Sequence, residues 1–243
     1  MKLLDKITVE ELPASSRRYP FVGFSPDREP GKEILETADI CKSVNGEQLL
    51  KNITFRLERT DKVCFISENE LAVTELFKIL AGEEEADSGT FKWGNTVSYS
   101  YFPKDNSSYF DGVELNLIDW MRQFTLKDNT ETYLRGFLGR MLFSGDEVFK
   151  PAKVLSGGER VRCMFSKMML YGSNALILDQ PTDHLDLESI TAVNNGLTAF
   201  NGIVLFTSHD HEFIQTVANR IIEITPEGIK DYRGTYDEYI ESK

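Results

Sequence analysis

The chain has 243 residues, 41% of them apolar and 27% charged, a balance that is typical of one globular domain with a short extension. Its formal net charge of −12 repels a phosphate backbone, which argues against nucleic-acid binding by the domain surface as a whole. No run approaches the roughly 20 apolar residues of a membrane helix and the start lacks a signal-peptide pattern, so we expect a cytoplasmic protein without a membrane segment of its own.

Residues 1–34 are expected to form an extension that lacks a hydrophobic core. Four prolines interrupt them, and their apolar residues follow no sustained period. Residues 15–20 (SSRRYP) are the best candidate for a local contact with nucleic acid. Phe21 to Phe24 are suited to docking on the domain surface, and the folded domain is expected to begin at residue 35.

Residues 35–101 alternate between strands and turns. The step Asn45-Gly46 between two β-rich runs predicts a tight hairpin. Gly82 is the expected C-terminal cap of a short apolar helix. The expected elements are strands at 34–44, 49–58 and 62–67, a helix around 76–80, and a second pair of strands at 89–93 and 96–101.

Residues 106–171 are predicted to be mostly helical, with helices at 115–124 and 133–142 and a third that begins after Ser156. Ser156 and Glu159 have the Ser-x-x-Glu spacing of a capping box, so the serine hydroxyl is expected to accept a free amide of the first turn. One apolar face follows at helical spacing: Val161, Met164, Phe165, Met168 and Met169.

The remainder of the chain, 172–243, predicts a β-α-β unit and further core elements. Residues 175–178 form a continuous apolar run that ends in Asp179, as expected for a strand covered on both faces. A helix at about 188–200 leads to an apolar strand at 202–207, so the two strands should be parallel. Together these elements predict the α/β class.

Three motifs in this order carry a resemblance to ATP-binding-cassette (ABC) ATPases. LSGGE at 155–159 resembles their signature motif, ALILDQPTDHLD at 175–186 their Walker B strand and D-loop, and TSHD at 207–210 their switch histidine. The resemblance covers residues 35–243 and implies a P-loop NTPase fold with a mixed, largely parallel core sheet. It further implies a β subdomain with the first core strand and helix at 35–101, a helical subdomain at 106–171 and the rest of the core at 172–243.

The same resemblance implies ATP and Mg²⁺ as cofactors and assigns roles to particular residues. Asp179 would bind the metal, His209 would contact a γ-phosphate, and Asp186 would belong to the D-loop. The signature consists of Leu155, Ser156, Gly157, Gly158 and Glu159. In this family the signature closes over the nucleotide of a partner cassette, which is either the other half of the same protein or a second copy.

The phosphate-binding loop departs from the family pattern. Its positions hold Ser67, Asn69, Ala72, Val73, Thr74 and Glu75. Asn69 and Thr74 fit, and Thr74 would be the second Mg²⁺ ligand. Val73 replaces the lysine that reaches the phosphates, a loss of a charge-assisted bond of about 1.5–3 kcal/mol. Ser67 replaces a glycine, and Glu68, Glu70 and Glu75 place carboxylates where a triphosphate would lie.

The catalytic position after Walker B is also changed. The family has a glutamate there that activates the attacking water, and this chain has Gln180. An amide can orient a water molecule but cannot accept its proton. Val44 stands where many cassettes stack an aromatic ring on adenine, and Lys104 falls near the metal-contacting glutamine. We therefore expect weak or no ATP hydrolysis by this chain alone.

Finer features favour one branch of the family. PTDHLDLES resembles the PTNHLD loop of ABC-F proteins, which carry two cassettes on one chain and act on ribosomes. FLGRMLFSGDEVFKPAKVLSGGE and the closing GTYDEYIE also resemble the second cassettes of that branch. We therefore expect an isolated second half, with a degenerate P-loop and a signature that completes a partner's site. Two alternatives remain: an active ATP-hydrolysing subunit of an ABC transporter, and a scaffold or interaction domain without nucleotide chemistry.

Overall fold

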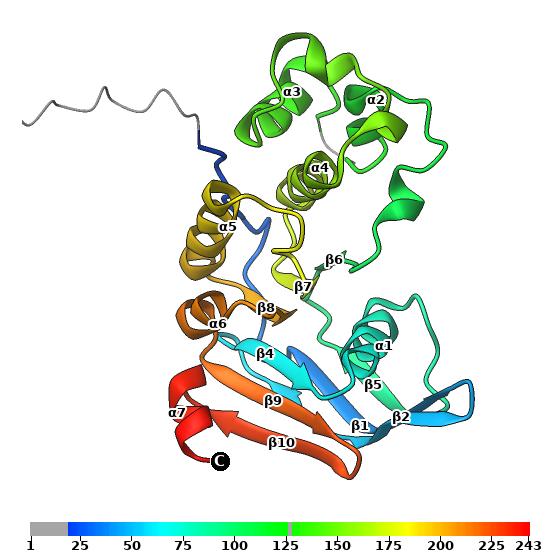
Figure 1. Cartoon of the computed structure of the whole chain (residues 1–243), viewed down its shortest axis with the longest axis vertical. Coiled ribbons are helices and arrows are strands. Elements are labelled where there is room, and N and C mark those ends of the chain that lie inside the picture. The colour runs from blue at the N-terminus through cyan, green and yellow to red at the C-terminus, as the bar shows by residue number, and fades with distance from the viewer. Residues whose placement is uncertain (1–18, 126–127) are drawn as a thin grey trace, which may run out of the picture.

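The computed structural model of the chain describes residues 19–125 and 128–243 and has an α/β fold with two sheets (Figure 1). Within this part of the chain, no helix is long and apolar enough to cross a membrane. Of the basic segment 15–20, only Tyr19 and Pro20 lie inside the described residues. The expected contact of that segment with nucleic acid therefore stays a prediction.

The first sheet is antiparallel and has four strands. These are β1 (Leu35–Val44), β2 (Glu47–Ile53), β3 (Arg56–Leu57) and β5 (Ser88–Trp93), with β1 paired to each of the others. The turn between β1 and β2 has positive φ angles at Asn45 (52°) and Gly46 (84°), residue types that tolerate this region. The predicted hairpin is confirmed.

The second sheet is the core of the molecule, with strand order β10-β9-β4-β8-β7-β6. Its strands are β4 (Lys62–Ser67), β6 (Tyr99–Phe102), β7 (Ala175–Asp179), β8 (Ile203–Thr207), β9 (Arg220–Thr225) and β10 (Gly228–Arg233). All pairs are parallel except β9 with β10. The parallel pairing predicted for β7 and β8 is confirmed.

The predicted pairing of 89–93 with 96–101 is wrong. Strand β5 pairs with β1 in the antiparallel sheet, whereas β6 lies beside β7 in the core sheet. The physical reason is burial: Tyr101 and Phe102 are almost fully buried, which fits a strand inside the core, whereas β5 is half exposed. Strand β10 is a further element that the sequence pattern did not reveal.

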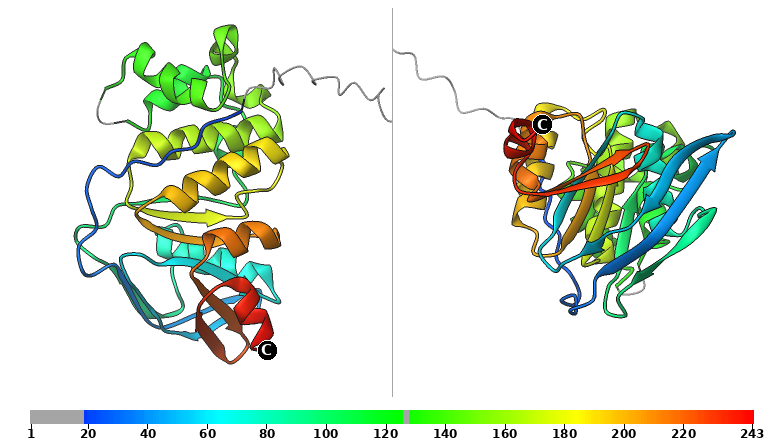
Figure 2. Two further views of the ribbon diagram at one scale, coloured as in Figure 1. Left: turned by 90° about the vertical axis from the view of Figure 1, so that its left-hand side faces the viewer. Right: turned by 90° about the horizontal axis from the view of Figure 1, so that it is seen from below.

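The helices are α1 (Glu70–Ala81), α2 (Leu117–Arg122), α3 (Glu131–Arg140), α4 (Gly157–Tyr171), α5 (Leu187–Ala199), α6 (His211–Val217) and α7 (Tyr236–Glu241). Gly82 ends α1 in the left-handed region, and the capping box of Ser156 and Glu159 begins α4. Both predictions are confirmed. Helices α2 to α4 form a lobe at the end of the molecule opposite the antiparallel sheet (Figure 2).

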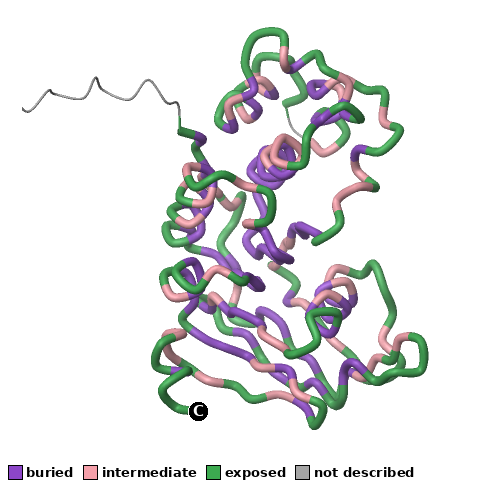
Figure 3. The backbone as a smooth tube through the Cα atoms, in the orientation of Figure 1, coloured by how far each residue is buried: buried purple, intermediate pink, exposed green. Residues whose placement is uncertain are grey.

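The core sheet is buried on both faces because alternate residues of its strands enter two different hydrophobic clusters. On β7, Leu176 and Leu178 pack with α4, whereas Ala175 and Ile177 pack on the side of α1 and the antiparallel sheet. The buried residues of Figure 3 accordingly run through the centre of the molecule. The apolar face predicted for α4 is buried in the first of these clusters.

Residues 19–34 lie along the domain as a strap. The amide of Phe21 donates to the carbonyl of Arg140 at the end of α3 (2.7 Å), and Phe24 packs edge-on against Phe200 (5.7 Å between ring centroids). Val22 is buried where it crosses Gly196 of α5. The prediction that this segment docks on the domain surface is confirmed.

Candidate functional site

Three neighbouring parallel strands end at one edge of the core sheet. Ser67 ends β4, Asp179 ends β7 and Thr207 ends β8, and Asp179 lies opposite Thr207 in the ladder. Ligands of open α/β sheets bind at the carboxyl ends of the strands. Gln180 follows directly on β7 and His209 lies two residues beyond the end of β8, so both belong to the same edge.

The loop between β4 and α1 consists of only Glu68 and Asn69. The Asn69 side chain accepts a hydrogen bond from the amide of Leu71 (3.1 Å), and its carbonyl accepts one from the amide of Ala72 (3.0 Å). Asn69 is thus the N-cap of α1, which begins at Glu70. The amides of Leu71 and Ala72 are therefore engaged inside the helix.

Early initiation of α1 turns two predicted loop residues inward. Val73 is only 2% exposed and packs in the cluster on the α1 side of the core sheet. Glu75 is 5% exposed, and its carboxylate pairs with Lys78 one turn along the helix (2.8 Å). The expectation that Glu75 would face bound phosphates is wrong, because position 75 falls on the buried face of a helix. Ala72 is buried as well.

Thr74 and Asp179 are brought together as the sequence predicts. The Thr74 hydroxyl donates to Asp179 Oδ2 at 2.8 Å, across from α1 to the end of β7. Burial raises the pKa of Asp179, and the Thr74 hydrogen bond opposes that shift. A hydroxyl and a carboxylate are hard oxygen ligands of the kind that Mg²⁺ takes. The described residues hold no group of three or more His, Cys, Asp or Glu with metal-binding geometry.

Glu70, the first residue of α1, contacts two loops of this edge, a role that sequence reasoning did not assign. Its Oε2 accepts from Lys104 Nζ (2.6 Å), and its Oε1 lies 3.1 Å from His209 Nε2. The Lys104 hydrogen bond chiefly lowers the pKa of Glu70, and the carboxylate in turn raises the pKa of Lys104. No local spacing in the sequence indicates these contacts, because Lys104 and His209 lie more than thirty residues away along the chain.

Gln180 has an unusual backbone and an incompletely bonded side chain. Its φ angle is 51°, in the left-handed region. Its Nε2 lies 3.1 Å from His209 Nε2, while its Oε1 is buried without a hydrogen-bond partner. Because an amide nitrogen only donates, one His209 tautomer cannot both accept from Gln180 and donate to Glu70. A rotated amide that presents Oε1 lets His209 donate to both residues.

The LSGGE segment forms the N-terminus of α4. The Ser156 hydroxyl accepts from the Glu159 amide (3.4 Å) and the Glu159 carboxylate accepts from the Ser156 amide (2.9 Å), while Leu155 is buried. A Cβ on Gly158 would lie 2.9 Å from the backbone oxygen of His184, so the glycine allows the 180–186 loop to approach.

Asp186 caps α5. Its side chain accepts from the Ser189 amide at 2.8 Å, and this hydrogen bond lowers the pKa of Asp186. The predicted D-loop residue thus has at least a structural role in this chain.

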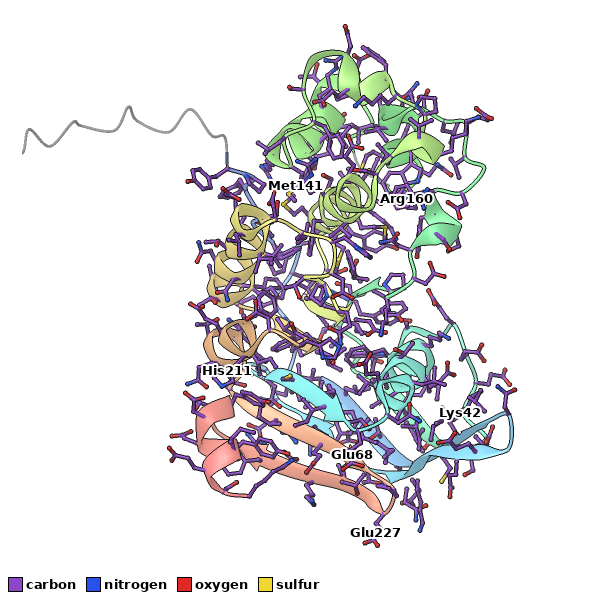
Figure 4. The ribbon with its side chains drawn as sticks, viewed as in Figure 1. Lys42, Glu68, Met141, Arg160, His211 and Glu227 are labelled. Atoms are coloured by element: carbon purple, nitrogen blue, oxygen red, sulfur yellow. The ribbon has the colours of Figure 1, made fainter. Side chains whose placement is uncertain are left out.

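The signature and the β4–α1 loop lie in different lobes. Figure 4 labels Arg160 on the first turn of α4 in the helical lobe, and Glu68 beside the strands at the other end. Arg160 is held there by Asp111 (2.8 Å). The start of α4 therefore lies apart from the chain's own β4–α1 loop.

This fold and its strand-edge site define a P-loop type of α/β domain, and comparisons with known proteins agree. Residues 50–183 match the family model described as ABC transporter. The dimeric post-hydrolysis structure of the ATP-binding cassette MJ0796, bound to ADP and Pi, is similar with a TM-score of 0.70 at 14% identity, over 82% of this chain and 98% of that one. At that identity the likeness shows the fold alone.

Curated relatives are similar over nearly the whole chain. The uncharacterized ABC transporter ATP-binding protein YkpA of Bacillus subtilis is 62% identical over 99% of this chain and 45% of its own length. The energy-dependent translational throttle protein EttA of Escherichia coli K12 is 32% identical over 88% of this chain and 39% of its own length. The chain thus spans less than half of these relatives. It belongs to the ABC family and is an ABC ATPase domain.

Proposed function

We propose that this chain is the second cassette of an ABC-F-like protein, whose own P-loop is degenerate and whose signature completes the ATP site of a partner cassette. The buried Val73 at the lysine position is the observation that carries this proposal. The proposed division is an extension at 1–34 and a nucleotide-binding domain at 35–243. The ABC family binds ATP with Mg²⁺ and its domains dimerise, which provides the chemistry and the geometry for such a role.

The chain's own loop fits a nucleotide poorly. A working P-loop offers free amides and a lysine to the phosphates. Here Asn69 engages the amides of Leu71 and Ala72, and no ammonium group stands at position 73. The missing charge-assisted bond alone removes about 1.5–3 kcal/mol of binding energy. Thr74 and Asp179 still fit Mg²⁺, but this ion usually needs substrate phosphates to complete its coordination.

The signature end supports the other half of the proposal. Helix α4 has fifteen residues and begins with Gly157 and Gly158, and Ser156 is its N-cap. The capping box of Ser156 and Glu159 stabilises this helix start. A helix N-terminus with approachable amides binds phosphate through hydrogen bonds and the helix dipole. Because α4 starts in the other lobe from the β4–α1 loop, the phosphate would belong to a partner domain.

Hydrolysis at the chain's own site lacks a base. Gln180 holds the catalytic position, and its side chain contacts His209 at 3.1 Å. An amide can hold a water molecule in place but cannot take its proton. We therefore assign the ATPase activity of the complex to the partner's site, where this chain would contribute Ser156 and the D-loop.

The branch assignment places the protein in the cytoplasm and on the ribosome. The sequence PTDHLDLES and the 32% identity to the translational throttle protein EttA support it. That this chain covers 45% of YkpA provides room for a partner cassette in the same polypeptide. The name of YkpA favours a second candidate, an active ATP-binding subunit of a transporter. Tight ATP binding by the isolated chain would support that second candidate.

A reconstitution experiment tests the proposal. The part of YkpA that this chain does not cover is prepared separately, and its Mg-ATP affinity and turnover are measured with and without this chain. We expect the chain to raise both, and Ser156→Ala to abolish the gain. Thr235→Ala is the matched control, since Thr235 is the N-cap of another capping box, on α7. A gain that survives Ser156→Ala, or no gain at all, would favour the scaffold alternative.

A further inference from the structure

We propose that the Glu70 carboxylate is a built-in substitute for phosphate: it fills the anion position between Lys104 and His209 from within the chain. The inference rests on the proposed function, since it explains how a degenerate site remains folded without a nucleotide. Lys104 and His209 form an oxyanion site whose resident ligand is a side chain of the same domain.

The contacts of Glu70 come from separate elements that converge on one group. Lys104 follows β6 and His209 follows β8, whereas Glu70 is the first residue of α1. The two carboxylate oxygens are divided between them, Oε2 to Lys104 at 2.6 Å and Oε1 to His209 at 3.1 Å. An anion held by one residue from each of two loops has the arrangement of a bound ligand.

The site lies where an anion would complete the strand-edge cluster. The charges of Lys104 and Glu70 both act on the pKa of Asp179, which hydrogen-bonds Thr74. His209 also contacts Gln180, the residue after Asp179. Glu70 therefore joins the same cluster as the residues that would face a terminal phosphate, and a bound phosphate group would compete with its carboxylate.

The early start of α1 places the Glu70 carboxylate at the N-terminus of the helix. Asn69 caps α1 so that Glu70 is its first residue. A carboxylate in the first turn is stabilised by the helix dipole. Its covalent attachment gives it a high effective concentration, in the millimolar range or above for short connections. A free phosphate must displace it, and it can reach the site because the side chains of Lys104, Glu70 and His209 are 41%, 49% and 65% exposed.

Rescue by phosphate tests this inference. The affinity for inorganic phosphate is measured from the shift of the thermal unfolding midpoint, with sodium chloride added to keep ionic strength constant. The proteins are wild type, Glu70→Ala and Glu68→Ala. Glu68 is an exposed carboxylate two residues away, so its replacement makes the same change of charge on the same loop. Glu70→Gln is included because it keeps the size of the side chain.

We expect both Glu70 variants to bind phosphate at least tenfold more tightly than wild type and Glu68→Ala, and the additional change His209→Ala to remove that gain. Equal phosphate affinity in wild type and the three single-substitution variants would overturn the inference. A gain in affinity that survives His209→Ala would overturn it as well. The outcome is separable from the proposed function: tight Mg-ATP binding by wild type would refute the degenerate site, whatever the phosphate comparison gives.

Discussion

Replacing Val73 with lysine, the residue expected in a working P-loop, should destabilise the chain and should not by itself restore ATP binding. Val73 is 2% exposed and lies among apolar side chains on α1. A lysine there must bury an ammonium group, lose its proton, or bend toward solvent. Losing the proton at pH 7 costs at most about 4–5 kcal/mol, from a free pKa near 10.4. Bending outward reduces that cost.

We therefore expect Val73→Lys to lower the free energy of unfolding by about 3–5 kcal/mol, a large part of the about 5–15 kcal/mol of a typical domain. Val73→Ala is the control for lost apolar contact and should cost about 1.5 kcal/mol for two methyl groups. Urea unfolding of both variants measures the difference. The excess cost of lysine should shrink as the pH rises toward about 10.4, where the lysine of the unfolded chain also loses its proton. A Val73→Lys protein within about 1 kcal/mol of wild type would refute the buried position of residue 73.

Three further predictions concern groups away from residue 73. Burial lowers the pKa of Lys167 from 10.5 to about 8, which costs about 3 kcal/mol of folding stability below pH 8 and less as the pH rises toward 10.5. Contacts of the ammonium group with two aromatic rings offset part of this cost. Lys167→Met should therefore stabilise the chain by about 1–2 kcal/mol at pH 7, measured by thermal or urea unfolding. Burial raises the pKa of Asp179, so its ionised carboxylate lowers the free energy of unfolding of wild type at neutral pH, and this loss diminishes as the pH falls toward 4. The gain in stability from Asp179→Asn should therefore be largest at pH 7 and smallest at pH 4. Gly196→Ala places a methyl group 2.7 Å from Val22, so it should release the strap, seen as faster amide exchange at Phe21, whereas Gly136→Ala, which meets open space on α3, should not.

Much of the fold could be predicted because its signals are local. The Ser156–Glu159 spacing, Asn45-Gly46 and Gly82 each act within a few residues, and each element formed as expected. The continuous apolar run ending in Asp179 likewise predicted a strand buried on both faces. The predicted pairing of β5 with β6 relied on their closeness in sequence and was wrong, because each of them pairs with a strand that lies far away along the chain.

The candidate site was predicted less completely, for a physical reason. Motif positions assume the geometry of a glycine-rich loop, but Asn69 begins a helix here, which places Val73 in the core and Glu75 against Lys78. The contacts of Glu70 with Lys104 and His209 join three segments separated by more than thirty residues, which no local spacing reveals. Thr74 and Asp179 met as predicted because the family pattern places them at adjoining elements.

The most direct test of the degenerate site is a calorimetric titration of Mg-ATP into the isolated wild-type chain. We predict no saturable binding up to about 1 mM, since each lost 1.4 kcal/mol weakens affinity about tenfold, the loop has no lysine at position 73, and the amides of Leu71 and Ala72 are already engaged by Asn69. Saturable binding with a micromolar dissociation constant would contradict it, because Val73 and the capped start of α1 would then be compatible with a working nucleotide site.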